Sequence, residues 1–289
     1  MNILVTGANG QLGQALRDAS VGSANKFVFS DVMIAEGMPT TILDITNISD
    51  VRKLTKEERI DVIVNCAAYT NVEKAEDDEE KAHILNCDAV RNLAVVAKEQ
   101  GITLIHMSTD FVYNGSKSSP YAETDAKNPV NAYARTKYAG EQAIKENGCK
   151  YILFRTAWLF SQYGSNFMKT MIRLTGERES LNVVYDQVGT PTYAPELANL
   201  IVKVIDNNML DKTGEYNFTC EGSVSWYDFA VMINYLSGHH CQIHPCSSAE
   251  YGSKVTRPSF SVLDKHKVRD TFGITIPHWF ESLRKCINE

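Results

Sequence analysis

The stretch Asn2-Ile3-Leu4-Val5-Thr6-Gly7-Ala8-Asn9-Gly10-Gln11-Leu12-Gly13 decides the fold. It reads as a short apolar strand, then three glycines at three-residue spacing, then the start of a helix. Such glycines permit a tight turn, a close approach of backbone to a pyrophosphate and close packing of helix on strand, while free N–H groups at the helix start face the anion. The stretch therefore predicts a dinucleotide site made by Gly7, Asn9, Gly10, Gln11, Leu12 and Gly13, although glycines also serve ordinary strand-to-helix turns.

Strand-like and helix-like segments alternate through the first half of the chain. Apolar runs predict strands over residues 2–6, 27–31, 40–43, 61–65, 102–107 and 150–155, and helical spacing predicts helices over 11–19, 47–57, 81–99 and 131–146. This pattern is typical of an α/β fold, a Rossmann-type doubly wound parallel sheet covered by helices.

The alternation loosens after about residue 158, where turn-rich pieces separate shorter elements. We expect a dinucleotide-binding domain over residues 1–158, which also takes in about 194–219. Residues 159–193 and 220–289 are expected to form a smaller C-terminal substrate-binding lobe.

Composition excludes several classes of protein. The formal net charge of −6 over 289 residues gives no reason to expect nucleic acid. The apolar runs are of strand length, and the N-terminus enters the first strand without the pattern of a signal peptide, so we expect a cytoplasmic protein with no membrane segment. The seven cysteines are scattered and odd in number, which favours reduced thiols.

The cluster from His239 to Cys246 holds three histidines and two of the seven cysteines, and metal ligands could come from it. It lacks the paired spacing of a zinc site, so we interpret it as a strand with its flanking loop and expect no metal ligands.

Asp31 ends the second predicted strand, about 20 residues beyond the glycines, where a carboxylate can accept hydrogen bonds from ribose hydroxyls. A carboxylate there would repel the 2′-phosphate of NADPH, so Asp31 favours NADH. A nearby cation could compensate, and Asp31 could also be a solvated strand-end residue.

Tyr133 and Lys137 lie four residues apart on a predicted helix, hence on one face. The pKa of a free tyrosine is about 10, and a nearby ammonium favours the phenolate, so Lys137 could bring Tyr133 closer to the range of a proton donor at neutral pH. On its own this spacing also fits an exposed tyrosine beside a lysine.

Ser108-Thr109-Asp110 follows the predicted strand 102–107. Ligands bind at the carboxyl edge of open α/β sheets, and a hydroxyl there can hydrogen-bond a substrate oxygen that changes between carbonyl and alcohol. Thr109 is the first candidate for that hydroxyl and Ser108 the second.

Together these residues resemble the extended short-chain dehydrogenase/reductase family, whose members pair GxxGxxG with a Ser/Thr, Tyr and Lys arrangement. The likeness is strongest to members that reduce keto sugars of nucleotides. It is carried in chain order by Gly7 to Gly13, Ala67 to Glu76, Ser108 to Tyr113, Tyr133 to Lys137, Asp186 to Thr192 and Arg257-Pro258. The resemblance implies reduction of the 4-keto group of dTDP-4-dehydro-L-rhamnose to dTDP-L-rhamnose by NADH or NADPH.

The resemblance also implies roles for individual residues. Thr109 would bind the keto oxygen, Tyr133 would donate the proton, and Lys137 would hold the nicotinamide ribose and lower the pKa of Tyr133. Further cofactor contacts would come from Asp44, Ile45, Ala67, Ala68 and Tyr69. The nucleotide sugar would meet Asp110, Trp158, Asn166, Gln187 and Arg257, of which Trp158 could equally be a core residue. Arginine suits a diphosphate because its forked donors match the anion.

One departure bears on the substrate, since Phe111 follows Thr109-Asp110 where the family often has Tyr. It disfavours a sugar-nucleotide dehydratase, which needs a Glu base there. The alternatives that stay open are a reductase or epimerase of another nucleotide sugar, and a non-catalytic regulatory subunit of the methionine adenosyltransferase type. Family members include homodimers, some bridged by Mg²⁺, but no carboxylates for such an ion can be matched in this sequence.

Overall fold

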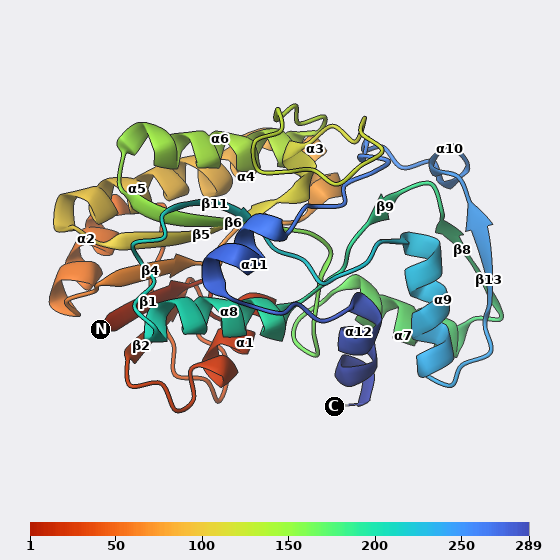
Figure 1. Cartoon of the computed structure of the whole chain (residues 1–289), viewed down its shortest axis with the longest axis horizontal. Helices are drawn as coiled ribbons and strands as arrows, with labels where there is room; N and C mark the ends of the chain where they lie inside the picture. Colours follow the sequence, from red (N-terminus) through yellow and green to blue (C-terminus); the bar gives the residue numbers. More distant parts are fainter. Residues whose placement is uncertain (289) are drawn as a thin grey trace.

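The computed structural model describes residues 1–288, and its centre is a seven-stranded parallel sheet in the order β11-β6-β5-β4-β1-β2-β3 (Figure 1). The predicted Rossmann-type sheet is confirmed. Its strands are β1 (Asn2–Thr6), β2 (Lys26–Asp31), β3 (Thr41–Ile42), β4 (Val62–Asn65), β5 (Thr103–Thr109), β6 (Lys150–Thr156) and β11 (Gly214–Asn217). Chain order reverses between β1 and β4, and ligands bind at the carboxyl ends of strands beside such a switch point.

Helices cover both faces of the sheet (Figure 1). Helices α1 (Gln11–Ala19), α8 (Ala194–Asp206) and α11 (His266–Phe272) pack on one face, and α2 (Ile48–Glu57), α5 (Ala89–Gln100) and α6 (Ala132–Asn147) pack on the other. In β1, Ile3 and Val5 enter the first core and Leu4 the second, because successive side chains of a strand point to opposite faces. Strands buried on both faces are continuous apolar runs for this reason.

The predicted helix 81–99 is interrupted. The structure has α4 (Glu79–His83), a π turn (Ile84–Asp88) and then α5. A Cβ at Gly140 of α6 would collide with the backbone oxygen of Asn86 in the π turn. The glycine thus lets α6, which carries Tyr133 and Lys137, lie directly on this turn.

A smaller, aromatic-rich core lies beyond the carboxyl edge of the sheet. It is formed by α7 (Phe167–Glu177), β8 (Ser180–Val184), α9 (Trp226–Leu236), β13 (Gln242–Cys246) and α12 (Trp279–Asn288). The cluster from His239 to Cys246 is a strand, β13, paired with β8, and its flanking loop, as expected. The division into two domains stays a prediction.

Short elements complete the chain: α3 (Val72–Asp77), a 3-10 turn η2 (Asp110–Val112), α10 (Ser248–Tyr251), and the two-residue strand pairs β7 (Leu159–Phe160) with β10 (Thr192–Tyr193) and β9 (Val188–Gly189) with β12 (Val224–Ser225). Among residues 1–288, no helix is both long and apolar enough to cross a bilayer.

Candidate active site

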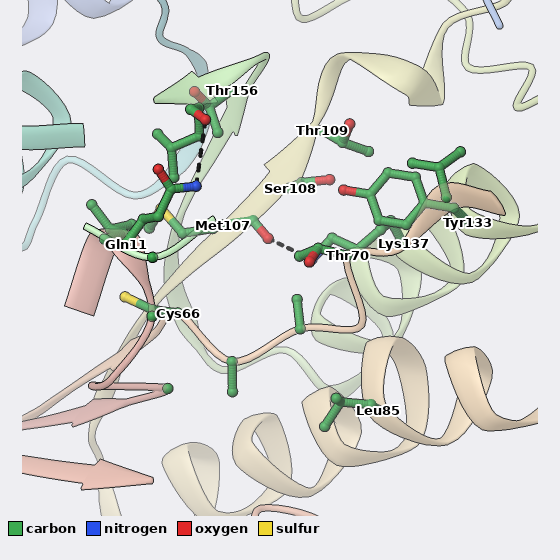
Figure 2. A pocket seen from close by; sticks show the side chains of 18 of the residues that line it. Gln11, Cys66, Thr70, Leu85, Met107, Ser108, Thr109, Tyr133, Lys137 and Thr156 are labelled. Carbon is green, nitrogen blue, oxygen red and sulfur yellow. Dashed lines mark hydrogen bonds between the residues drawn. The ribbon is translucent and has the colours of Figure 1, made fainter. Parts of the chain in front are cut away.

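A pocket opens at the carboxyl ends of β1, β4 and β5 and runs from the glycine loop to α6 and the smaller core (Figure 2). Of the residues predicted from the sequence, it is lined by Gly7, Gly10, Gln11, Leu12, Asp31, Ile45, Ala67, Ala68, Ser108, Thr109, Asp110, Tyr133, Lys137, Trp158, Asn166 and Arg257. Residues from all parts of the chain therefore meet where the sheet topology places a ligand.

The glycine loop is built for close approach. Gly7 has φ of 65°, and a Cβ there would lie 2.5 Å from the backbone nitrogen of Ala67. A Cβ at Gly13 would lie 2.5 Å from the Gly7 oxygen, so Gly13 serves the packing of α1 on the loop and does not line the pocket. Asn9 also lies outside the lining; its backbone N–H donates to Asp31 Oδ2 at 3.0 Å and its side-chain amide to the backbone oxygen of Met33.

Asp31 lines the pocket with both carboxylate oxygens already accepting backbone N–H groups, from Asn9 and from Val32. The cation considered in the sequence analysis is present as Arg17. Its guanidinium lies 4.2 Å above the Phe29 ring and donates to the backbone oxygen of Pro39. Burial lowers the pKa of Arg17 and the charge of Asp31 partly offsets this.

The structure separates several neighbouring candidates. Ile45 reaches the pocket, whereas Asp44 turns away and accepts hydrogen bonds from Thr46. Ala67 and Ala68 form the wall after β4, but Tyr69 is outside the lining and its backbone pairs with the Asn86 side chain through N–H and oxygen.

Ser108 and Thr109 end β5, and their hydroxyls have different partners. Ser108 Oγ donates to Glu141 Oε1 at 2.5 Å, in a buried contact behind the strand. Thr109 Oγ1 lies 3.1 Å from Asp110 Oδ1, accepts from the N–H of Phe111 and interacts with the Tyr133 hydroxyl. The structure thus favours Thr109 over Ser108 as the hydroxyl that meets a substrate.

Tyr133 and Lys137 point from α6 toward the end of β5, as Figure 2 shows. Burial raises the pKa of Tyr133 to about 12, which the Thr109 hydroxyl lowers in part and the Asp110 charge raises. Burial also lowers the pKa of Lys137 to about 8, and its ammonium donates to the Met107 oxygen at 2.7 Å. Lys137 is not among the groups that shift the pKa of Tyr133 in the free protein, so its expected effect on that pKa stays a prediction.

Of the candidate substrate residues, Trp158 lines the pocket and Gln187 does not. Trp158 adopts φ of 48°, and its ring stacks on Trp226 with centroids 3.5 Å apart. Trp226 also lines the pocket and was missed by the sequence reasoning, because only tertiary contact brings the start of α9 here. Gln187 lies outside the lining, and its side-chain amide donates to Ser248 Oγ at 2.9 Å.

Asn166 and Arg257 line the pocket but are already held by protein groups. The Asn166 amide donates to Gln11 Oε1 at 2.9 Å and its oxygen caps α7. The Arg257 guanidinium donates to Glu73 Oε1 and to Ser253 Oγ, each at 2.6 Å, and its side chain keeps a fifth of its surface exposed. Arg257 keeps unused N–H donors for an anion, whereas the Asn166 amide already donates to Gln11 Oε1 and to the backbone oxygen of Ser161.

A buried ion pair supports the strands and helix that carry these groups. The Arg155 guanidinium on β6 donates to both oxygens of Glu141 on α6, at 2.9 and 2.7 Å, and neither side chain has any exposed surface. Glu141 also receives the Ser108 hydroxyl, so β5, β6 and α6 are tied together one helical turn from Lys137.

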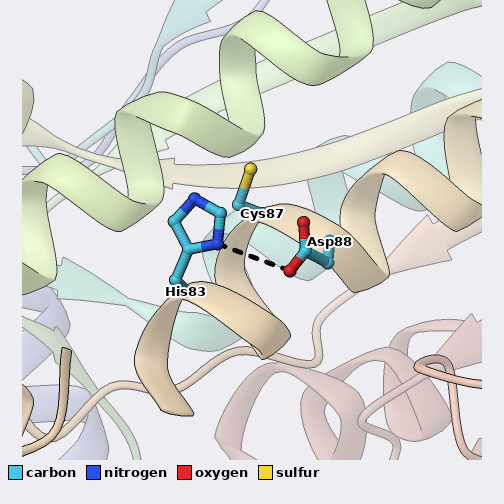
Figure 3. Close-up of side chains that lie close together, drawn as sticks. All are labelled: His83, Cys87 and Asp88. Carbon is cyan, nitrogen blue, oxygen red and sulfur yellow. Dashed lines mark ion pairs between the residues drawn. The ribbon is translucent and has the colours of Figure 1, made fainter. Parts of the chain in front are cut away.

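One group of potential metal ligands occurs within the described chain, formed by His83, Cys87 and Asp88 (Figure 3). The His83 ring lies 3.4 Å from Asp88, and Arg91 donates to Asp88 and to the Cys87 sulfur. An arginine on two of three ligands opposes a cation, and Mg²⁺ requires oxygen ligands, so we assign no metal to this group.

Comparison with known proteins agrees with this geometry. The family model described as RmlD substrate binding domain matches residues 1–289. A dTDP-4-dehydrorhamnose reductase of Escherichia coli is 36% identical over 298 residues, which cover 100% of this chain and 98% of the relative. A crystal structure of a dTDP-4-dehydrorhamnose reductase from Clostridium acetobutylicum superposes with a TM-score of 0.92 at 40% identity, covering 100% of this chain and 99% of the other. A crystal structure of a dTDP-4-dehydrorhamnose reductase from Bacillus anthracis, in complex with NADP, superposes with a TM-score of 0.89 at 36% identity. The match covers 99% of this chain and 98% of the other. The chain thus belongs to the dTDP-4-dehydrorhamnose reductase family, within the extended short-chain dehydrogenase/reductases.

Proposed function

We propose that this protein reduces the 4-keto group of dTDP-4-dehydro-L-rhamnose to give dTDP-L-rhamnose, with NAD(P)H as the reductant. The observation that carries the proposal is the convergence of Thr109, Tyr133 and Lys137 at the end of β5, in the pocket that begins at the glycine loop. The full-length likeness to reductases of that name supports the substrate.

The residues of the first half of the pocket fit a dinucleotide. Gly7 and Gly10 line its start without side chains of their own, and Ile45, Ala67 and Ala68 offer an apolar wall. When bound, NAD(P)H supplies the hydride that adds to C4 of the sugar. Asp31 favours NADH, while Arg17 beside it is placed to offset the charge of a 2′-phosphate, and a relative binds NADP.

Side chains of the protein bind and protonate the keto oxygen of the sugar. Thr109 donates a hydrogen bond to the keto oxygen and orients it, and Tyr133 gives its proton to that oxygen as the carbonyl becomes an alcohol. Lys137 holds the ribose side of the cofactor and stabilises the phenolate left on Tyr133. Trp158, Asn166 and Arg257 hold the nucleotide sugar, with Asp110 beside its reacting end.

Three further expectations stay predictions: a homodimer, a Mg²⁺ ion between subunits and a cytoplasmic location. The predicted contacts of Asp44, Tyr69 and Gln187 also stay predictions, since none of the three lines the pocket.

The test follows absorbance of NADH and, separately, NADPH when the protein meets dTDP-4-dehydrorhamnose made in situ. We expect oxidation with dTDP-L-rhamnose as product, and the ratio of the two rates tests Asp31. Cofactor binding without oxidation would point to another keto sugar, which Phe111 would explain, or to the regulatory-subunit alternative.

A further inference from the structure

The carboxyl of Asp110 is the least expected group in the site. The residue is 2% exposed, and its Oδ2 makes no close and well-aligned hydrogen bond within the described residues. Buried polar atoms of folded proteins almost always have partners, and an ionised carboxylate has more need of them than a neutral acid. The other oxygen, Oδ1, lies 3.1 Å from the hydroxyl of Thr109.

The Thr109 hydroxyl has one proton to give and two lone pairs to accept with. The N–H of Phe111 occupies one lone pair, at 3.2 Å. The bond between Thr109 and Asp110 can run in either direction, and the choice fixes what Thr109 offers to the pocket.

If Asp110 is ionised, the carboxylate takes the only proton of Thr109. Thr109 then has a lone pair left for the Tyr133 hydroxyl, whose proton points at Thr109 and away from a substrate. If Asp110 is protonated and donates through Oδ1, both lone pairs of Thr109 are occupied. The protons of Thr109 and Tyr133 are then both free for a keto oxygen.

The surroundings favour the neutral acid near neutral pH. Burial raises the pKa of Asp110 to about 7, although the hydroxyls of Ser261 and Thr109 and two backbone N–H groups stabilise the anion. From α6 the phenol of Tyr133 faces it, and from the C-terminal segment the uncharged Ser261 does. The other charged side chains lining the pocket are Asp31, Lys137 and Arg257.

We propose that Asp110 enters the reaction as a neutral carboxylic acid that donates to Thr109 Oγ1 and thereby turns the Thr109 and Tyr133 protons toward the keto oxygen. Asp110 is thus a positioning residue, and its proton stays on it through the reaction. The role rests on the proposed function.

The first measurement needs no turnover: the ¹³C chemical shift of the Asp110 carboxyl in Asp-labelled protein, titrated with and without NADH and assigned by Asp110→Asn. We expect a midpoint near 7, with Asp125 as the internal reference, because the Lys117 ammonium lowers the pKa of that carboxyl. A midpoint for Asp110 near the ordinary value of about 3.9 would overturn the proposal.

The second measurement is the single-turnover rate of NADH oxidation against pH. For the wild type and for Asp125→Asn, we expect a tenfold fall per pH unit above about 7. In Asp110→Asn the amide donates to Thr109 at every pH, so the fall should begin only near 8, where Lys137 loses its charge. The pH profile of Thr109→Val should also lack the fall that begins near pH 7, and its rate below that pH should be lower than that of the wild type.

If the rate of Asp110→Asn began to fall at the same pH as that of the wild type, the role of Asp110 would be refuted while the reductase assignment stayed intact. No NADH oxidation by the wild type at any pH would instead refute the proposed function, and the carboxyl titration would still report on Asp110.

Discussion

Replacing Arg155 by Met should cost far more stability than replacing an exposed arginine that makes the same two-bond fork to a carboxylate. The guanidinium makes two charged bonds to Glu141, one to Glu215 and one to the Tyr113 hydroxyl, with no surface exposed. Charged hydrogen bonds are worth about 1.5–3 kcal/mol each, and removing one partner of a buried pair costs about 3–5 kcal/mol. Glu215 keeps Lys145, so most of the loss falls on Glu141.

The chain provides a matched control in Arg52, which makes the same two-bond fork to Glu99 at 2.7 and 2.9 Å but with more than 40% of each side chain exposed. Arg52→Met should change stability very little, because solvent screens an exposed ion pair. In urea unfolding followed by tryptophan fluorescence, a slope of about 3 kcal/mol/M converts the loss for Arg155→Met to a midpoint shift of at least about 1 M, and the shift for the control should be far smaller. Equal shifts would refute the reasoning, because burial would then have no effect on the pair.

Four further changes have expected outcomes. Tyr133→Phe should lower turnover by about 10²- to 10⁴-fold while a fluorescence titration finds cofactor affinity unchanged; unchanged turnover would remove Tyr133 as proton donor. Gly13→Ala places a Cβ 2.5 Å from the Gly7 oxygen, so thermal unfolding should show a loss of about 1–3 kcal/mol together with weaker cofactor binding. Because burial lowers the pKa of Lys137 to about 8, its positive charge is present below that pH and lost above it, and turnover of Asp110→Asn should fall as pH rises through 8. Trp226→Ala removes an aromatic ring that lines the pocket; an aromatic contact is worth about 0.5–1.5 kcal/mol, so KM for the nucleotide sugar should rise about two- to twelvefold with KM for NADH unchanged.

The strands that could be predicted are those whose signal is local. β1 and β4 each contain a run of three apolar residues because helices cover both of their faces. β11 was not predicted as a strand, since Gly214–Asn217 is short and polar, and its place depends on pairing with β6. The π turn before α5 was missed for the same reason, because it depends on Asn86 meeting the backbone of Tyr69 and the glycine of α6.

The residues of the candidate site also fall into those with a local sequence signal and those that depend on tertiary contacts. The glycine loop and the Tyr133-Lys137 pair were predictable, since each is a short spacing with a direct geometric meaning. Thr109 was ranked above Ser108 from the sequence, but the physical reason was not visible there, because it depends on Glu141, which occupies the Ser108 hydroxyl from a distant part of the sequence. Likewise no local pattern indicates that Gln187 binds Ser248.

The raised pKa of Tyr133 was also beyond the sequence, and it bears on the direction of the reaction. A phenol with a pKa of about 12 keeps its proton at neutral pH, so the donor form is fully present before the hydride adds. The alkoxide formed on the sugar is a stronger base than this phenolate, and the proton moves to it readily. Oxidation of the alcohol needs the phenolate first, and burial makes that form scarce. The free site therefore holds the proton-donor form at neutral pH, and oxidation of the alcohol should gain from a higher pH until Lys137 loses its charge.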